Sequence, residues 1–80
     1  AFELGRDRLA GDGIGIVNLI REAGLVDSNK DGFRAIEQGG LTIDGDKVVD
    51  AKLHLREEDF PGGAILIRRG KKKYCRVVLV

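Results

Sequence analysis

The stretch "LIREAGLVDSNKDGFRAIEQGGLTIDGDKV", residues 19–48, decides the fold, because its hydrophobic pattern changes from a helical period to a strict alternation. Apolar residues at its start, and just before it, recur at helical spacing and end at Gly24. Glycine readily takes the left-handed conformation that ends many helices. We therefore expect a first helix over about residues 14–23.

A second helical pattern begins after Ser28. The pair Ser28 and Asp31, three residues apart, resembles a capping box, in which side chains satisfy free amide donors at a helix start. Phe33 and Ile36 are expected to face the core, and Gly39 follows the last periodic residue. The pattern predicts a helix between Ser28 and Gly39.

The rest of the chain is typical of β-structure. Asp44–Gly45 lies between β-forming residues and predicts a tight two-residue hairpin. Residues 51–63 are expected to form a loop, and residues 64–69 and 74–80 two strands joined around "GKKK". Alternation along the last strand predicts one face with Cys75, Val77 and Leu79 and another with Tyr74, Arg76 and Val78.

Helix, helix and then strands indicate a small α+β domain, with two short helices followed by a mostly antiparallel sheet. Residues 1–13 show no sustained period, so we expect a linker or disordered N-terminal end there and the domain over residues 14–80. No apolar run approaches the roughly 20 residues that span a bilayer, and no secretory signal is recognisable. A single cysteine, Cys75, cannot form an internal disulfide, which favours a reducing, cytoplasmic setting.

The residue spacing in two motifs excludes the ligand-binding loops that they resemble. "GDGIGI" lacks the sixth glycine and the preceding strand of a dinucleotide loop, and "DGDKVVD" lacks the ligands of a calcium loop. His54 and Cys75 are the only residues of their kinds, so neither belongs to a metal-binding set. Without a nucleophile and a partner base, we expect no catalysis and no cofactor in this chain.

Charge is distributed very unevenly. Residues 1–59 hold eight Lys or Arg and thirteen Asp or Glu, a net charge of −5, whereas residues 60–80 hold six basic residues and no acid. Such asymmetry is typical of a surface that meets a polyanion. Arginine forks onto phosphate oxygens, and lysine adds mobile point charges. The pattern favours nucleic acid over an acidic membrane or protein partner, and Tyr74 could contact a base or sugar or pack inward.

Residues 19–48 resemble the RNA-binding domain named after ribosomal protein S-four, which contains the alpha-L motif. That family has a helix ending in Gly-Leu, a serine at the next helix start, an isoleucine and glycine at its end, and a glycine turn. The matching residues are Leu25, Ser28, Ile36, Gly39 and Gly45. "AILIRRGKKKYCRVVLV", residues 64–80, resembles the C-terminal end of bacterial-type tyrosyl-tRNA synthetases.

This resemblance implies an RNA-binding appendage that serves protein biosynthesis. In those enzymes a separate catalytic domain activates tyrosine with ATP and forms the homodimer, while the C-terminal domain grips tyrosine tRNA around its long variable arm. The resemblance implies tRNA binding by a monomeric, non-catalytic domain in the cytoplasm. The expected RNA-binding residues form a helix wall and a hairpin wall: Ser28, Lys30 and Arg34, and Arg68, Arg69, Lys71, Lys72, Lys73 and Arg76.

The chain departs from the family in its second helix. Asn29 and Phe33 occupy positions that are usually basic, and Gly32 replaces the usual alanine. Lys30 and Arg34 each lie one place later, which on a helix is about 100° of rotation. This shifts the expected affinity toward the hairpin. Two alternatives stay open, namely an S-four-like module of a ribosome-associated or RNA-modifying protein, and a protein-interaction module for an acidic partner.

Overall fold

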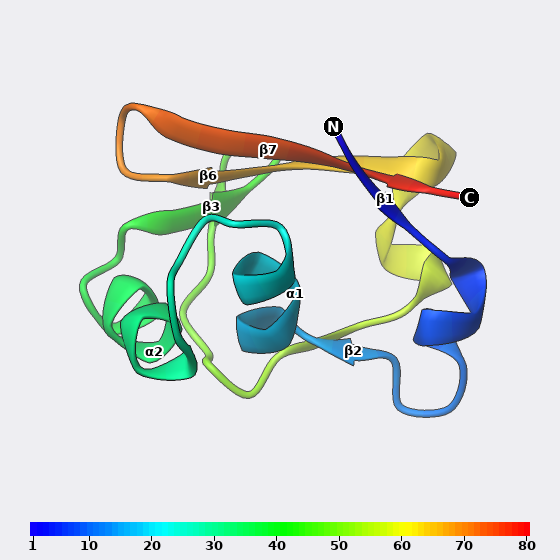
Figure 1. Cartoon of the computed structure of the whole chain (residues 1–80), viewed down its shortest axis with the longest axis horizontal. Helices are drawn as coiled ribbons and strands as arrows, with labels where there is room; N and C mark the ends of the chain where they lie inside the picture. Colours follow the sequence, from blue (N-terminus) through cyan, green and yellow to red (C-terminus); the bar gives the residue numbers. More distant parts are fainter.

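The computed structural model describes residues 1–80 and consists of two layers, in which two helices cover one face of a five-stranded sheet (Figure 1). The helices are α1 (Ile16–Glu22) and α2 (Asn29–Glu37). The sheet has the order β1-β7-β6-β3-β4, with bounds Phe2–Leu4, Lys73–Leu79, Ala64–Arg69, Leu41–Ile43 and Asp46–Lys47 respectively. Only β1 and β7 are parallel, so the expected α+β fold with a mostly antiparallel sheet is confirmed.

Both helices lie where the sequence pattern puts them. Helix α1 starts at Ile16 rather than residue 14, because Ile14–Gly15 forms a short strand, β2. Helix α2 begins after Ser28, whose Oγ accepts a hydrogen bond from the amide of Asp31 at 3.2 Å. This contact satisfies one of the free donors at the helix start and confirms the predicted cap.

The two helices approach closely at Gly32. A Cβ at this position would lie 3.0 Å from Cγ1 of Val17 on α1, so the absence of a side chain permits the observed packing. Gly32, Ala35 and Ile36 form the buried side of α2. Phe33 was expected to face the core, but its side chain is 44% exposed. That expectation was wrong, because the inward position next to α1 belongs to Gly32 and Phe33 is rotated away by about 100°.

Both hairpins are confirmed. Asp44 and Gly45 have positive φ values of 50° and 90° and join β3 to β4, as a tight two-residue turn requires. Strands β6 and β7 pair from Ala64↔Val78 to Arg69↔Lys73. The predicted faces of β7 are also confirmed, because Val77 and Leu79 are buried while Tyr74 and Arg76 are exposed.

The N-terminal residues are ordered parts of the sheet. β1 pairs in parallel with β7, from Phe2↔Val77 to Leu4↔Leu79, and the short 3-10 helix η1 (Arg6–Leu9) follows. Leu4 and Leu9 belong to the core. The expectation of a linker or disordered end at residues 1–13 was therefore wrong for this part of the chain. The pairing joins the two ends of the chain, and no local period reveals it.

The segment expected to be a loop at residues 51–63 contains short regular elements. β5 (His54–Leu55) pairs antiparallel with β2. Two 3-10 helices follow, η2 (Glu57–Asp59) and η3 (Pro61–Gly63). Leu55 and Phe60 are buried in the core, and so the segment packs against the rest of the domain.

One core of 19 buried residues, all of them apolar, lies between the sheet and the helices. The face of the sheet away from the helices has no covering layer (Figure 1). It carries Leu66, 38% exposed, and Tyr74, 67% exposed. None of the helices is both long and apolar enough to cross a bilayer.

Candidate nucleic-acid interface

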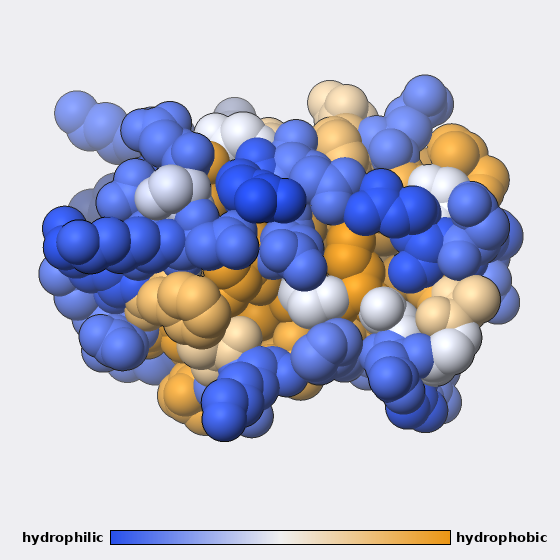
Figure 2. All heavy atoms as spheres, turned by 60° about the horizontal axis from the view of Figure 1, so that its bottom comes forward, coloured by the Kyte–Doolittle hydropathy of each residue, from blue (hydrophilic) through white to orange (hydrophobic).

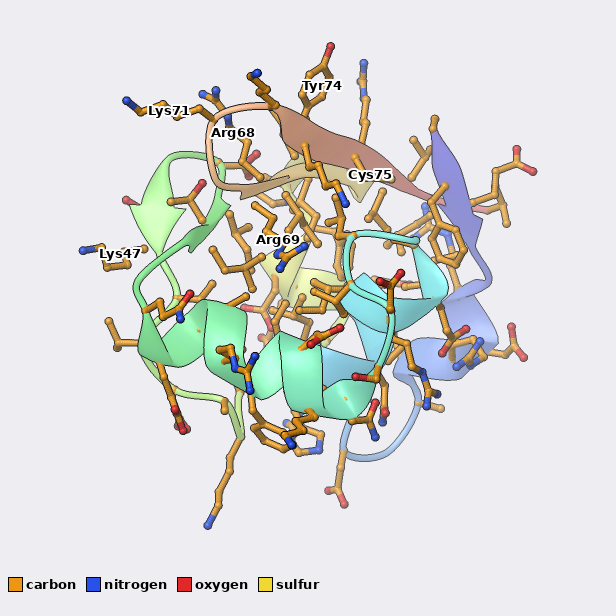
Figure 3. All side chains as sticks on the ribbon, turned by 60° about the vertical axis from the view of Figure 1, so that its left-hand side comes forward. Lys47, Arg68, Arg69, Lys71, Tyr74 and Cys75 are labelled. Carbon is orange, nitrogen blue, oxygen red and sulfur yellow. The ribbon has the colours of Figure 1, made fainter.

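The β6–β7 hairpin sends its basic side chains to two different faces. Arg69 pairs with Lys73 and Arg68 pairs with Tyr74 in adjacent registers. Because successive strand residues point to opposite faces, Arg69 and Lys73 share the helix side, while Arg68, Tyr74 and Arg76 share the open side. Figure 3 shows Arg69 between the sheet and the helices, and Arg68 and Tyr74 pointing away from them.

On the helix side, Arg69 and Lys73 line a groove of about 270 Å³ with the C-terminal end of α2. The other lining residues are Ala35, Gln38, Gly40 and Gly70. Arg69 is half-buried, and its Nη1 donates to the carbonyl oxygen of Leu25 at 3.3 Å. Lys73 is exposed, so its ammonium group is free to meet a ligand at the rim.

Helix α2 continues this basic surface. Lys30, Arg34 and Gln38 are spaced by four residues and therefore lie along one side of the helix. All three are exposed, and Gln38 lines the groove with Arg69 and Lys73. The expected helix wall thus connects to the helix-side half of the hairpin through Gln38.

The turn of the hairpin carries Lys71 and Lys72, both exposed. The amide of Gly70 donates to the carbonyl oxygen of Gly40 at 2.8 Å, which ties the turn to the start of β3. Arg68 reaches toward the same turn, and its Nη2 donates to the carbonyl oxygen of Lys71 at 3.4 Å. These two hydrogen bonds therefore fix the backbone of the turn that carries Lys71 and Lys72 at the end of the sheet.

The six hairpin cations do not form the single wall that the sequence predicted. They wrap around the end of the hairpin, with Arg69 and Lys73 on the helix side, Lys71 and Lys72 at the turn, and Arg68 and Arg76 on the open side. The reason is the two-residue period of a strand, which separates neighbouring arginines such as Arg68 and Arg69 onto opposite faces.

None of these cations is neutralised by a carboxylate of the domain. The structure contains two ion pairs, Arg6–Glu57 at 3.0 Å and Arg8–Glu22 at 2.7 Å, and both lie outside the hairpin. The hydrogen-bonded Arg8 guanidinium lowers the pKa of the Glu22 carboxyl below its ordinary value. The hairpin charges, by contrast, remain available for an external polyanion.

The start of α2 is less basic than its middle. Ser28 is engaged in capping, and Asp27 and Asp31 flank Lys30. Two carboxylates at this position oppose the approach of a phosphate, although the helix dipole would favour one. The basic part of the helix wall is consequently centred on Arg34 rather than on Ser28.

Phe33 lies on another part of the surface. It lines a shallow hollow with Asn18, Asn29, Lys52 and His54, among others. Figure 2, which brings the lower side of Figure 1 forward, shows apolar side chains between hydrophilic ones on that face. The Nδ1 atom of His54 lies 2.8 Å from the carbonyl oxygen of Lys52. No group of three or more His, Cys, Asp or Glu side chains is placed to hold a metal ion.

Two further residues that no sequence motif marked, the neutral Gln38 and the basic Lys47, adjoin the hairpin cations. Gln38 lines the groove. It lies four residues after Arg34, so the helical period alone could have placed it on the same side of α2 as Arg34. Lys47 on β4 aligns with Thr42, which aligns in turn with Arg68. Figure 3 shows Lys47 pointing outward from this edge of the sheet. Its place follows only from the pairing of three strands.

A separate hollow of about 490 Å³ is acidic. Asp44, Asp46, Asp50, Glu58 and Asp59 line it, together with apolar residues and Lys47. Like charges at such density repel phosphate. This hollow adjoins the basic surface, because Lys47 lines it and Asp44 also lines a second hollow with Arg76.

Comparison with known proteins places the chain in a family. Residues 5–77 match the family described as Tyrosine–tRNA ligase SYY-like C-terminal domain. The chain is 44% identical over 78 residues to a tyrosine–tRNA ligase of Clostridium perfringens strain 13, which covers 98% of this chain and 18% of that protein. It is 46% identical over 65 residues to the tyrosine–tRNA ligase of Clostridium beijerinckii, covering 81% of this chain and 16% of that protein.

The chain thus spans less than a fifth of the length of these relatives. The match covers nearly all of the chain, including α2, both hairpins and the basic turn. The resemblance carried by residues 19–48 and 64–80 is confirmed. The chain belongs to the family of tyrosine–tRNA ligase C-terminal domains.

Proposed function

We propose that this chain is a tRNA-binding module that grips the region of the long variable arm, mainly through phosphate contacts. The helix side of the hairpin and the exposed side of α2 form one continuous cradle. Gln38, Arg69 and Lys73 line its groove, and Arg34 lies one turn before Gln38 on α2. The turn lysines Lys71 and Lys72 close its end. An RNA helix is recognised largely through its shape, phosphates and 2′-hydroxyls, which suits a surface rich in mobile cations.

The observation that carries this proposal is that six cations lie close together in sequence, on one hairpin, without a carboxylate partner. Holding like charges together costs self-repulsion, which bound phosphates relieve. The acidic hollow lined by Asp46 and Asp50 lies outside this cradle and disfavours RNA there. Phosphates are thereby directed to the hairpin and away from this hollow.

We propose further that the module acts within a longer tyrosine–tRNA ligase, in the cytoplasm. In this proposal, tyrosine activation with ATP and formation of a homodimer belong to residues outside the chain. The module contributes affinity and orientation for tyrosine tRNA and performs no chemistry. Its own residues hold no catalytic set, since His54 and Cys75 are the only side chains of their types.

The test is a titration of the 80-residue chain with a tRNA that has a long variable arm, at several salt concentrations. Neutralising about four to six phosphates predicts a slope of roughly −3 to −5 for log K against log salt. Replacing the three turn-proximal lysines by alanine should lower affinity and reduce the magnitude of the slope by about 2. The replaced residues are Lys71, Lys72 and Lys73.

A matched control removes the same number of charges elsewhere. Arg21, Lys52 and Arg56 are exposed and lie outside the cradle, so their triple alanine variant should retain most of the affinity. A flat salt response, or equal losses for both triple variants, would contradict the proposal. Equal binding to ribosomal RNA fragments and plain duplexes would instead indicate an S-four-like module of broader specificity.

A further inference from the structure

The open face of the sheet carries an exposed aromatic ring flanked by two arginines. Tyr74 is 67% exposed, and Arg68 lies directly opposite it on β6. Arg76 follows two residues later on the same strand and therefore shares the face, at a spacing of about 7 Å. Leu66, opposite Arg76, adds an apolar surface beside them.

The fold does not need this ring. Tyr74 is neither part of the buried core nor among the partly buried residues packed against it. Its hydroxyl group makes no hydrogen bond within the domain. Cys75, the next residue, by contrast packs against the core. An aromatic side chain left this exposed on a regular strand is available for a ligand.

The charge around the ring suits an anion. Arg68 and Arg76 have no carboxylate partner in the structure. Two acids adjoin this face. Asp44 accepts a hydrogen bond from the amide of Leu66 through its Oδ1 and lines a hollow with Arg76, and Glu3 on β1 aligns with Val78, two residues after Arg76. Asp44 is thus engaged by the main chain, and Glu3 aligns four residues along the strand from Tyr74.

An unpaired nucleotide combines the two properties that this surface would recognise. Its base has a flat face that stacks on an aromatic ring or a guanidinium plane, and its phosphate is an anion. A paired base inside a helix offers no free face. We propose that the open face, centred on Tyr74 between Arg68 and Arg76, binds an unpaired nucleotide of the RNA by stacking.

This inference rests on the proposed function and adds a second contact surface to it. The cradle on the helix side holds the phosphates of a helical segment, whereas the open side holds a base that has left a helix. Lys71 and Lys72 at the turn lie between the two surfaces. A strand that leaves a paired region can therefore pass around the hairpin end from one surface to the other.

Tyr74 provides its own probe, because it is the only tyrosine and the chain has no tryptophan. Labelling of the tyrosine ring with carbon-13 gives the magnetic resonance signals of Tyr74 alone. Adding a short oligoadenylate should move its ring protons upfield through the ring current of a stacked base. A blunt-ended RNA duplex should bind through the cradle and leave the ring signals nearly unmoved.

Variants separate stacking from charge. Tyr74→Leu keeps an apolar side chain but loses the ring, and should weaken oligoadenylate binding by about 5- to 100-fold, as expected for one stacked base. Tyr74→Phe keeps the ring and should bind nearly as well as the parent chain. Val49→Ala is a matched control, because it truncates an apolar side chain that is 81% exposed beside the acidic hollow.

The possible results separate this inference from the proposed function. If RNA binds with the expected salt dependence but the Tyr74 ring signals stay in place, the stacking surface is wrong and the cradle stands. If no RNA binds at all, both fail. A polyglutamate peptide that moves the ring signals as far as oligoadenylate would overturn the assignment to a nucleobase. The ring signals of the unsubstituted chain decide the matter even if a variant fails to fold.

Discussion

The guanidinium group of Arg69 donates a hydrogen bond to the carbonyl oxygen of Leu25 at 3.3 Å, and so joins the basic hairpin to the connection between α1 and α2. One cation of the interface is therefore also a structural contact between the two layers. Arg69 is half-buried and forms part of the wall of the groove beside the end of α2. The proposed interface therefore couples stability to RNA affinity at this residue.

Arg69→Ala should lower both stability and RNA affinity. Loss of the contact to Leu25 should reduce the free energy of unfolding by about 1–2 kcal/mol. Arg69→Lys keeps the charge but loses the planar fork, so it should retain most of the salt slope with part of the stability loss. Urea unfolding and RNA titration measure the two effects separately. Unchanged stability in Arg69→Ala would show that the contact contributes nothing to the fold.

Ser28→Ala should weaken the domain without changing its RNA interface. The Ser28 Oγ caps α2 through the Asp31 amide, and removal of such a cap costs about 0.5–2 kcal/mol. Ser28→Thr keeps the oxygen and should restore most of the stability. Thermal unfolding measures the effect. RNA affinity, compared at a temperature where all variants are folded, should differ by less than about 2-fold, since the cap holds no charge.

A larger loss of affinity in Ser28→Ala than in Arg34→Ala would contradict this assignment. It would place the centre of the helix wall at the helix start. The structure puts Asp27 and Asp31 there, and the exposed Arg34 one turn later. The comparison therefore decides which end of the wall meets phosphate.

Asp44→Asn should leave stability nearly unchanged and raise RNA affinity. Asparagine tolerates the positive φ of 50° and keeps an oxygen for the amide of Leu66. It removes a negative charge that lines a hollow with Arg76, which should strengthen RNA binding by about 2- to 5-fold. Asp44→Ala loses the acceptor and should unfold at lower urea concentration. If Asp44→Asn lowers affinity, the open face does not meet an anion.

The ion pair between Arg8 and Glu22 should make stability depend on pH in the acidic range. The Arg8 guanidinium, through its hydrogen bond, lowers the pKa of Glu22 in the folded chain. The unfolded chain therefore binds a proton first as pH falls, so the stabilisation is present above the ordinary glutamate pKa, about 4.3, and is lost below it.

Glu22→Gln removes this term and is the matched variant for it. The difference in urea midpoint between the parent chain and Glu22→Gln should be modest near pH 7 and should shrink as the pH falls through the pKa of folded Glu22. The direction is fixed by the lowered pKa of Glu22. A difference that grows toward acid pH would mean that Glu22 is not stabilised as a carboxylate.

Much of this protein follows from short-range pattern. The helical period before Gly24, the cap at Ser28 and the Asp44–Gly45 turn each depend on residues within a few positions of one another, and all three are observed. Alternation along β7 placed Val77 inside and Tyr74 outside correctly. The sequence also indicated the family, because residues 19–48 and 64–80 keep its spacing.

The errors have one physical cause, which is pairing between distant segments. The strand Phe2–Leu4 exists because β7 supplies its hydrogen-bond partners, and β5 exists because β2 supplies its own. The paired strands are far apart in the sequence. Each of them is also too short to show a hydrophobic period, so the local pattern does not reveal the pairing. Phe33 was misplaced for a related reason, since Val17 and Gly32 determine how closely α1 and α2 approach.

By itself, the sequence determined the two helices, the two hairpins, the family, and the presence of an unbalanced positive charge near the C-terminus. Only the tertiary structure decided where that charge lies. The two-residue period of the strands and the covering of one face by helices send Arg69 into a groove with α2 and Arg68 to the open side with Tyr74. Composition sets the net charge of a segment. A binding surface also depends on the direction in which each charged side chain points, and strand pairing and packing determine that direction.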